Sequence, residues 1–279
     1  MLDIVKSAVF GVVEGVTEWL PVSSTGHMII LDQFLSLDQP TDFVNLFLVV
    51  IQLGAILAIV VSFWRTLWPF RRCKQGDNKS LLDRNKLSLW LKILVACVPA
   101  AVVGLLCDDY FEKWFYNATS VAIALMVFGV AFIVVERINK KRQPKVTELS
   151  QITIPMALAI GMFQLVAAIF PGTSRSGATI VGALMLGVSR TVAAKFTFCL
   201  AVPVMVGASA LKIAKYGLGF TGMQIAILLV GMLVAFVVSL VVVKWLMKYI
   251  KRHDFQIFGW YRIGLGLLVL SLSAMSIIR

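Results

Sequence analysis

Long hydrophobic runs alternate with short polar segments along almost the whole chain. Six of these runs are close to the roughly 20 residues that a helix needs to cross a lipid bilayer. The pattern predicts an all-α polytopic membrane protein with a single membrane domain over residues 1–279. Its six transmembrane helices are expected at about 43–63, 88–107, 119–135, 196–213, 224–243 and 256–276.

Two further hydrophobic runs, 4–31 and 152–188, are interrupted by residues that break helices. Pro21 interrupts the first run and Pro171 interrupts the second, and a glycine follows each of them within six residues. Each run is therefore predicted to form two half-helices that enter and leave the membrane on one side, a re-entrant pair. A bilayer tolerates such a break where the freed backbone groups line a polar cavity or are buried in protein.

The second half of the chain repeats the order of the first. At an offset of 150 residues, Pro21 and Ser24 coincide with Pro171 and Ser174, at the points where the two runs break. Each half contains one re-entrant pair and three spans, and because three is odd the halves have opposite orientations in the membrane. This predicts an inverted-topology repeat whose two breaks meet near the midplane. The predicted repeats are 1–136 and 151–279.

Composition and charge agree with this class of protein. The chain is 59% hydrophobic and 14% charged, which is too little charge to coat a soluble globule of this size. A net charge of +12 would suggest nucleic acid as the partner of a soluble domain, but Lys and Arg gather between the hydrophobic runs, so nucleic acid is not expected. By the positive-inside rule, the basic segments 64–92, 137–145 and 244–252 face the cytoplasm and the C-terminus lies outside.

The first broken run carries unusual polar chemistry for its place in a membrane, namely Glu14, Glu18, Ser24 and His27. An ionisable group at membrane depth costs on the order of 2.5–3.5 kcal/mol even on the lenient insertion scale, so the cluster is a candidate functional site. Glu14 and Glu18 are four residues apart and share a helix face. Two buried carboxylates need a metal ion, an arginine or a shared proton, so we expect them to bind a divalent cation or to act as acid and base.

Residues suited to anion binding surround both breaks. Ser23 and Ser24 in the first break, and Thr173 and Ser174 in the second, are expected to be N-cap residues of the half-helices that follow. Two helix N-termini would then point their free N–H groups at one site, an arrangement that binds phosphate. Arg175 adds a permanent charge and a planar fork of donors. The expected substrate-binding residues are Ser23, Thr25, Thr173, Ser174, Ser176 and Gln164.

His27 lies one helical turn after Ser24. Its imidazole could take the proton of the Ser24 hydroxyl or attack phosphorus directly. We favour Ser24 as the nucleophile and His27 as its base, and the sequence leaves both assignments open. The expected catalytic residues are Glu14, Glu18, Ser24, His27 and Arg175, with Glu14 and Glu18 also as metal ligands.

The two motifs GVVEGVTEWLPVSSTGH, which ends at His27, and PGTSRSGAT, which contains Arg175, resemble those of the bacterial undecaprenyl-diphosphatase family of the bacitracin-resistance type. The resemblance covers essentially the whole chain. It implies hydrolysis of undecaprenyl diphosphate to undecaprenyl phosphate and inorganic phosphate, which recycles the lipid carrier of peptidoglycan and other cell-wall polymers. It also implies a multi-pass protein of the bacterial cytoplasmic (inner) membrane, an active site facing the outside, and a divalent cation, with Mg²⁺ favoured over Ca²⁺.

Two other classes of protein fit some of these features. A secondary transporter or polyprenyl-lipid flippase would share the inverted repeat and broken helices, although a carrier has little need for a serine and histidine beside an arginine. A membrane lipid phosphatase related to the acid phosphatases needs two site histidines, and the second histidine here, His253, lies in a predicted cytoplasmic loop. The oligomeric state stays open, a homodimer included.

Overall fold

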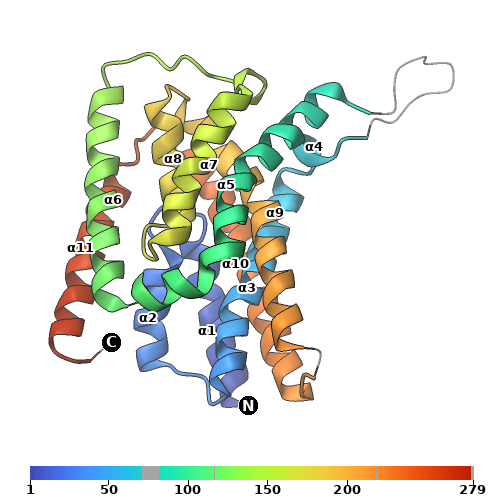
Figure 1. Ribbon diagram of the computed structural model, residues 1–279, viewed down its shortest axis with the longest axis vertical. Helices are drawn as coiled ribbons and strands as arrows, with labels where there is room; N and C mark the ends of the chain where they lie inside the picture. The colour runs from blue at the N-terminus through green and yellow to red at the C-terminus, as the bar shows by residue number, and fades with distance from the viewer. Residues whose placement is uncertain (71–81, 116, 218, 278–279) are drawn as a thin grey trace.

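The computed structural model describes residues 1–70, 82–115, 117–217 and 219–277 (Figure 1). These residues are mostly helical, and the extended pairings found among them are two isolated bridges. Residues 71–81 of the predicted basic segment 64–92 lie outside the described residues.

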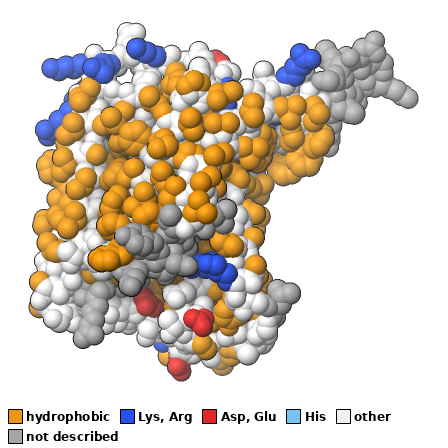
Figure 2. Space-filling view, in the orientation of Figure 1, with side chains coloured by type: hydrophobic (Ala, Val, Ile, Leu, Met, Phe, Trp, Pro, Cys, Tyr) orange, Lys and Arg blue, Asp and Glu red, His pale blue; other side chains and the backbone are white. Residues whose placement is uncertain are grey.

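Six helices of the described chain are long and apolar enough to cross a membrane. On the face that Figure 2 shows, hydrophobic side chains cover a broad area, and most of the visible Lys and Arg side chains lie above it. This confirms the prediction of an all-α polytopic membrane protein with six spans. The six helices are α3 (Thr41–Ser62), α5 (Arg84–Phe115), α6 (Ala118–Asn139), α9 (Arg190–Tyr216), α10 (Gly222–Tyr249) and α11 (Gln256–Ala274).

Each of the two interrupted runs forms a pair of shorter helices around a break. The first run gives α1 (Leu2–Thr17) and α2 (Ser24–Phe34), and the second gives α7 (Ile154–Ile169) and α8 (Arg175–Met185). In Figure 1 the first pair lies at the end of the molecule that holds both chain termini, and the second pair lies toward the opposite end. Two short elements complete the fold, α4 (Trp64–Leu67) and the 3₁₀ helix η1 (Leu149–Gln151).

The helices of the two halves pack in matching ways. α1 packs on α10 in the same manner as α7 packs on α5, while α6 pairs with α11 and α3 pairs with α9. A glycine lies at each of the first two contacts. A Cβ added at Gly11 would meet the carbonyl oxygen of Gly231 at 2.6 Å, and one added at Gly161 would meet that of Ala96 at 2.3 Å. Only glycine allows such close approach of the two backbones.

A buried arginine of α11 links the two breaks. Arg262 is fully buried, and its guanidinium donates to the carbonyl oxygens of Pro21 at 3.4 Å, of Gly172 at 3.0 Å and of Thr173. Its acceptors therefore come from both halves of the chain, and they are carbonyl groups that no helix satisfies. The rings of Phe128 and Phe132 lie 5.7 and 5.9 Å from the guanidinium carbon. Arg262 thus holds the two breaks against each other.

Candidate active site

One serine caps the half-helix after each break. Ser23 and Ser174 have positive φ angles of 72° and 66°, and their hydroxyl oxygens accept hydrogen bonds from the N–H groups of Gly26 at 3.4 Å and Gly177 at 3.2 Å. A non-glycine residue in this region is strained, and such strain persists where the surrounding structure holds it. The two broken pairs thus share an uncommon backbone conformation.

These caps correct part of the sequence prediction. Ser23 and Ser174 are N-caps as expected. Ser24 and Thr173 are not, because Ser24 is the first residue of α2 and Thr173 lies one residue before the N-cap of α8. A helix has only one N-cap residue. Its backbone is not yet helical, and its side chain accepts a hydrogen bond from the N–H of the residue three positions later. The caps are 151 residues apart, one more than the offset of the sequence repeat, and Ser24 therefore corresponds to Arg175.

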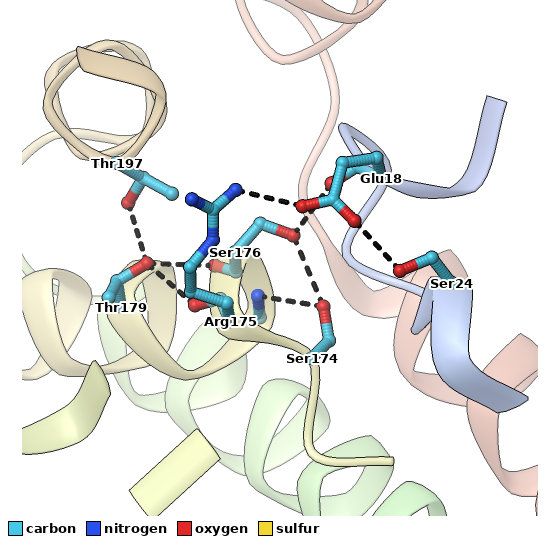
Figure 3. Close-up of polar contacts among 8 residues, drawn as sticks. Glu18, Ser24, Ser174, Arg175, Ser176, Thr179 and Thr197 are labelled. Carbon is cyan, nitrogen blue, oxygen red and sulfur yellow. Dashed lines mark hydrogen bonds and ion pairs between the residues drawn. The ribbon is translucent and has the colours of Figure 1, made fainter. Parts of the chain in front are cut away.

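The carboxylate of Glu18 lies between the starts of the two half-helices (Figure 3). Its Oε2 accepts a hydrogen bond from the Ser24 hydroxyl at 2.7 Å, and its Oε1 accepts one from Nη2 of Arg175 at 2.8 Å. The Glu18 backbone carbonyl accepts from the Ser176 hydroxyl at 3.2 Å. One acidic side chain thereby joins the serine of one half to the arginine of the other.

A chain of hydroxyl groups fixes the first turn of α8 behind Arg175 (Figure 3). The hydroxyl groups of Ser174 and Ser176 are hydrogen-bonded at 3.1 Å. The Thr179 hydroxyl donates back to the carbonyl oxygens of Arg175 at 2.9 Å and Ser176 at 3.2 Å, and it accepts from Thr197 of α9 at 2.9 Å. Arg175 therefore projects from a turn that is held on both sides.

Several buried polar atoms of the predicted site have no hydrogen-bond partner among the described residues. They are Oε1 of Glu14, both amide atoms of Gln164, Oγ1 of Thr173 and Nη1 of Arg175. Each unmade hydrogen bond of a buried polar group costs about 1–3 kcal/mol. Several unpartnered polar groups among the predicted site residues are what is expected of a site that a polar ligand completes.

The same atoms allow a test of the expected metal site. Glu14 and Glu18 are one helical turn apart, since the N–H of Glu18 donates to the carbonyl oxygen of Glu14 at 3.0 Å. The described residues contain no group of three or more His, Cys, Asp or Glu side chains that could hold a metal ion. Two carboxylates are nevertheless enough for Mg²⁺ when phosphate oxygens and water supply the other ligands. The free Oε1 of Glu14 fits this role.

His27 has partners that the sequence did not indicate. Its Nδ1 lies 2.7 Å from the carbonyl oxygen of Ser23, and its Nε2 lies 2.8 Å from the hydroxyl of Tyr261. A carbonyl oxygen only accepts, so Nδ1 must donate, and in the neutral imidazole Nε2 then carries the lone pair. The two rings are stacked, with centroids 5.7 Å apart. Both ring nitrogens are thus engaged by groups other than Ser24.

The structure therefore brings several of the predicted site residues to one place. Glu18, Ser24, Arg175 and Ser176 are hydrogen-bonded into one cluster, and Ser174 supports it. Thr25 lies half-buried in the first turn of α2, beside Ser24 in sequence. The sequence analysis missed Tyr261 and Arg262, which are adjacent on α11. Arg262 could have been noticed, because it is an arginine inside the predicted span 256–276.

The fold and the site together define a multi-pass membrane protein with a buried, hydroxyl-rich site, built from two broken helices, in which a carboxylate and a guanidinium group are paired. Residues 7–268 match the family model described as Bacitracin resistance protein BacA. The chain belongs to this family.

Named relatives agree with the family model over nearly the full length of the chain. The chain is 57% identical over 270 residues to the undecaprenyl-diphosphatase of Desulfitobacterium hafniense, a match that covers 97% of this chain and 96% of the relative. It is 54% identical to undecaprenyl-diphosphatase 1 of Clostridium acetobutylicum, covering 96% and 97% of the two chains. It is 52% identical to the undecaprenyl-diphosphatase of Enterococcus faecalis, covering 98% of each.

Proposed function

We propose that this protein hydrolyses undecaprenyl diphosphate to undecaprenyl phosphate and inorganic phosphate, and thereby returns the lipid carrier to cell-wall synthesis and confers resistance to bacitracin. The names of its relatives and of its family support the reaction and its substrate. The observation that carries the proposal is the Glu18 carboxylate, which bonds a candidate nucleophile on one side and a phosphate-binding arginine on the other. A base beside the nucleophile and a cationic group for the phosphoryl oxygens are two of the parts that phosphoryl transfer uses.

The diphosphate is held by the start of α8 and by Arg175. The free Nη1 of Arg175 and the unpartnered Oγ1 of Thr173 are donors that a phosphate oxygen can use. The N-termini of α2 and α8 add the positive ends of two helix dipoles. These groups stabilise the charge that develops on the equatorial oxygens of the transferred phosphoryl group.

In the chemical step, the Ser24 oxygen attacks the terminal phosphorus and gives its proton to Glu18. The Ser24 hydroxyl already donates to that carboxylate at 2.7 Å, so proton transfer needs no rearrangement. The bond from the terminal phosphorus to the bridging oxygen breaks, and undecaprenyl phosphate leaves. Water then attacks the phosphoserine, and Glu18 returns its proton to the Ser24 oxygen as the bond from that oxygen to phosphorus breaks. The proton lost by the water leaves with the inorganic phosphate. Glu18 takes here the role of base that the sequence analysis gave to His27.

Direct attack by His27 on the terminal phosphorus is the second route, and the hydrogen bonds of the His27 ring are compatible with it. The Nδ1 donation to Ser23 leaves the lone pair of the neutral ring on Nε2, where the Tyr261 hydroxyl donates to it. A substrate that displaces Tyr261 would meet a nucleophilic nitrogen. On this route a phosphohistidine replaces the phosphoserine. On the Ser24 route, His27 instead serves to hold the backbone of the Ser23 cap.

We also propose a divalent cation, Mg²⁺ before Ca²⁺, at Glu14 with Glu18 as the neighbouring carboxylate. When bound, the cation would neutralise charge on the diphosphate oxygens. The chain itself contributes the unpartnered Oε1 of Glu14 and the amide oxygen of Gln164, which are hard oxygen donors.

The placement in the membrane is likewise part of the proposal. The matched packing of α1 with α10 and α7 with α5 supports an inverted repeat with two re-entrant pairs. The bacterial relatives and the positive-inside rule favour the bacterial cytoplasmic membrane, with the α1–α2 pair and the active site open to the outside. A homodimer stays a prediction.

Orientation is tested by labelling. A cysteine replacing the exposed Lys141, in a chain without the native cysteines, should react with a membrane-impermeant reagent only after the cells are broken. Reaction in intact cells would reverse the assigned orientation.

The function is tested with purified protein in detergent and undecaprenyl diphosphate. Wild-type protein should release phosphate, and a chelator should reduce the rate. Ser24→Ala and His27→Ala separate the two routes. If Ser24 is the nucleophile, an acid-stable phosphoprotein should form in His27→Ala and be absent from Ser24→Ala. If His27 is the nucleophile, an acid-sensitive phosphoprotein should form in Ser24→Ala and be absent from His27→Ala. Folded wild-type protein that releases no phosphate under any cation would refute the proposed hydrolysis.

A further inference from the structure

A cavity lies at the end of the molecule opposite to the chain termini. It has a volume of about 360 Å³ and is enclosed by the end of α6 and the loop after it, the end of α8, the start of α9 and the end of α10. α8 runs between this cavity and the active site, with Arg175 at one end and Met185 at the other. Eleven helical residues span about 16 Å, so the two sites are separate.

Four cationic side chains line this cavity, which we call the basic pocket: Arg142, Lys145, Arg190 and Lys251. None of its described lining residues is an Asp or Glu. Arg190 is neutralised by the buried Glu136, to which it donates at 2.5–3.0 Å. The other three cations are exposed, and the described residues near them give no ion pair. The pocket therefore holds an excess of about three positive charges, which favours an anionic ligand.

The backbone around the basic pocket is held in place by hydrogen bonds. Lys145 and Val146 donate through their N–H groups to the carbonyl oxygen of Gly187 at 2.8 and 3.2 Å, and Ser189 donates to that of Val146 at 2.8 Å. These bonds fix the loop against the start of α9. The N-cap of α9, Ser189, makes no side-chain capping bond, so the first N–H groups of this 27-residue helix remain for a ligand. They supplement the cationic side chains.

A lipid-facing surface leads to the rim of the pocket. Val130, Val134 and Ile138 form one exposed stripe on α6, at 51%, 47% and 47% exposure, and the stripe ends beside Asn139 of the pocket. Met185, which lines the pocket, is 58% exposed. The ends of three spans, α6, α9 and α10, meet here, which is the level of lipid head groups. An acyl chain could lie along the stripe while its head group enters the pocket.

We propose that the basic pocket binds a phosphate group, presented by an anionic phospholipid or by free inorganic phosphate. Arginine forks, lysine charges and a helix N-terminus are the groups that recognise phosphate oxygens. This site does not depend on the proposed hydrolysis, and it lies on the face that the charge pattern assigns to the cytoplasm.

The test uses full-length protein in a neutral detergent and a matched pair of triple variants. The pocket variant is Arg142→Gln, Lys145→Gln and Lys251→Gln, which leaves the Arg190–Glu136 pair in place. The control variant is Arg137→Gln, Lys140→Gln and Lys141→Gln, which removes the same charge from exposed positions at the same end of the molecule that do not line the pocket. Each protein is titrated with short-chain phosphatidylglycerol, with phosphatidylcholine of the same chains, and with inorganic phosphate, and its thermal midpoint is recorded.

We expect phosphatidylglycerol to raise the midpoint of the wild-type and control proteins more than phosphatidylcholine does, and to bind the pocket variant at least about tenfold more weakly. If inorganic phosphate binds the pocket variant more weakly than it binds the control variant, while phosphatidylglycerol binds both equally, free phosphate is the ligand. Phosphate bound at Arg175 contributes equally to all three proteins, so it cancels in the comparison. Equal titrations for the pocket and control variants with every ligand would overturn the proposal.

Discussion

The two broken helix pairs have nearly the same backbone and very different chemistry. Each places a serine at positive φ as the N-cap, and each packs its first helix through a glycine. The acidic residues and the histidine occur in the first pair alone. At the repeat offsets of 150 and 151, Glu18 corresponds to Ala168 and His27 to Ala178.

This difference suggests a division of labour. In the proposed Ser24 mechanism, the first pair contributes Glu18 and Ser24, the groups that move the proton and form the new bond, and the second pair contributes Arg175, the group that holds the anion. The repeated backbone supplies two facing helix N-termini, and the side chains of the first helical residue in each decide what each does. In that mechanism, the chemistry depends on the two half-helices starting with different side chains on similar backbones.

The largest effect is expected from Glu18→Gln, which removes the one carboxylate that joins the two pairs. Phosphate release should fall on the order of 10³-fold, because the proton acceptor of Ser24 is lost and Arg175 is left without its counter-ion. The rate is measured with undecaprenyl diphosphate. Asp42→Asn, an exposed carboxylate at the start of α3, is the matched control and should keep wild-type activity. Retained activity in Glu18→Gln would exclude a proton-transfer role.

Arg175→Lys tests whether the second pair supplies more than charge. A lysine keeps the charge but has no planar fork, so it cannot bond Glu18 and a phosphate oxygen together. We expect a loss of about 10²-fold in kcat/KM, with KM affected as well as kcat. If the lysine variant keeps most of its activity, the arginine acts merely as a counter-ion.

Arg262→Lys breaks the link between the pairs without touching either set of reacting groups. Three carbonyl oxygens from both breaks lose a shared donor, so we expect kcat to fall about tenfold and the thermal midpoint to drop. Arg262→Met, which fills the volume but donates nothing, should be worse in both measurements. A lower midpoint with unchanged kcat would limit Arg262 to a structural role.

The smallest effect on activity is expected at the two glycines through which the first helix of each pair packs, where substitution should change stability instead. Gly11→Ala and Gly161→Ala should each destabilise the protein by about 1–3 kcal/mol, since the new Cβ would meet a backbone carbonyl oxygen in both. Gly207→Ala, where a Cβ meets nothing within 4 Å, is the control and should be neutral or stabilising. Thermal unfolding of the three variants gives the comparison; a large difference between Gly11→Ala and Gly161→Ala would weaken the case for a repeat.

Much of the fold could be predicted because a bilayer imposes strict rules on length and hydrophobicity. The spans α3, α6 and α11 begin and end within a few residues of their predicted bounds. The span α5 (Arg84–Phe115) extends beyond its predicted bounds of 88–107 at both ends. Pro99 lies inside the predicted span and does not end the helix, because a proline in a helix packed against neighbours need not end it.

The sequence predicted that certain polar residues of the two breaks lie close together, but it did not predict several of their contacts. Glu18, Ser24 and Arg175 were expected to meet because the repeat brings the breaks together. The identity of the capping residue was missed at Ser24 and Thr173, since it depends on a backbone angle that neighbouring serines and threonines do not distinguish. Tyr261 as the partner of His27 lies 234 residues away, and contacts over such a separation leave no local pattern.

The position of Arg262 also bears on how the substrate reaches the site. In alternating access, two halves of a transporter rock apart around a fixed centre. Here the same buried guanidinium bonds Pro21 of one half and Gly172 and Thr173 of the other, so rocking at the breaks would strip a buried charge of its acceptors. That step costs at least about 1–3 kcal/mol for each bond lost. These bonds favour a proposed catalytic centre that stays fixed, to which the lipid brings its own head group.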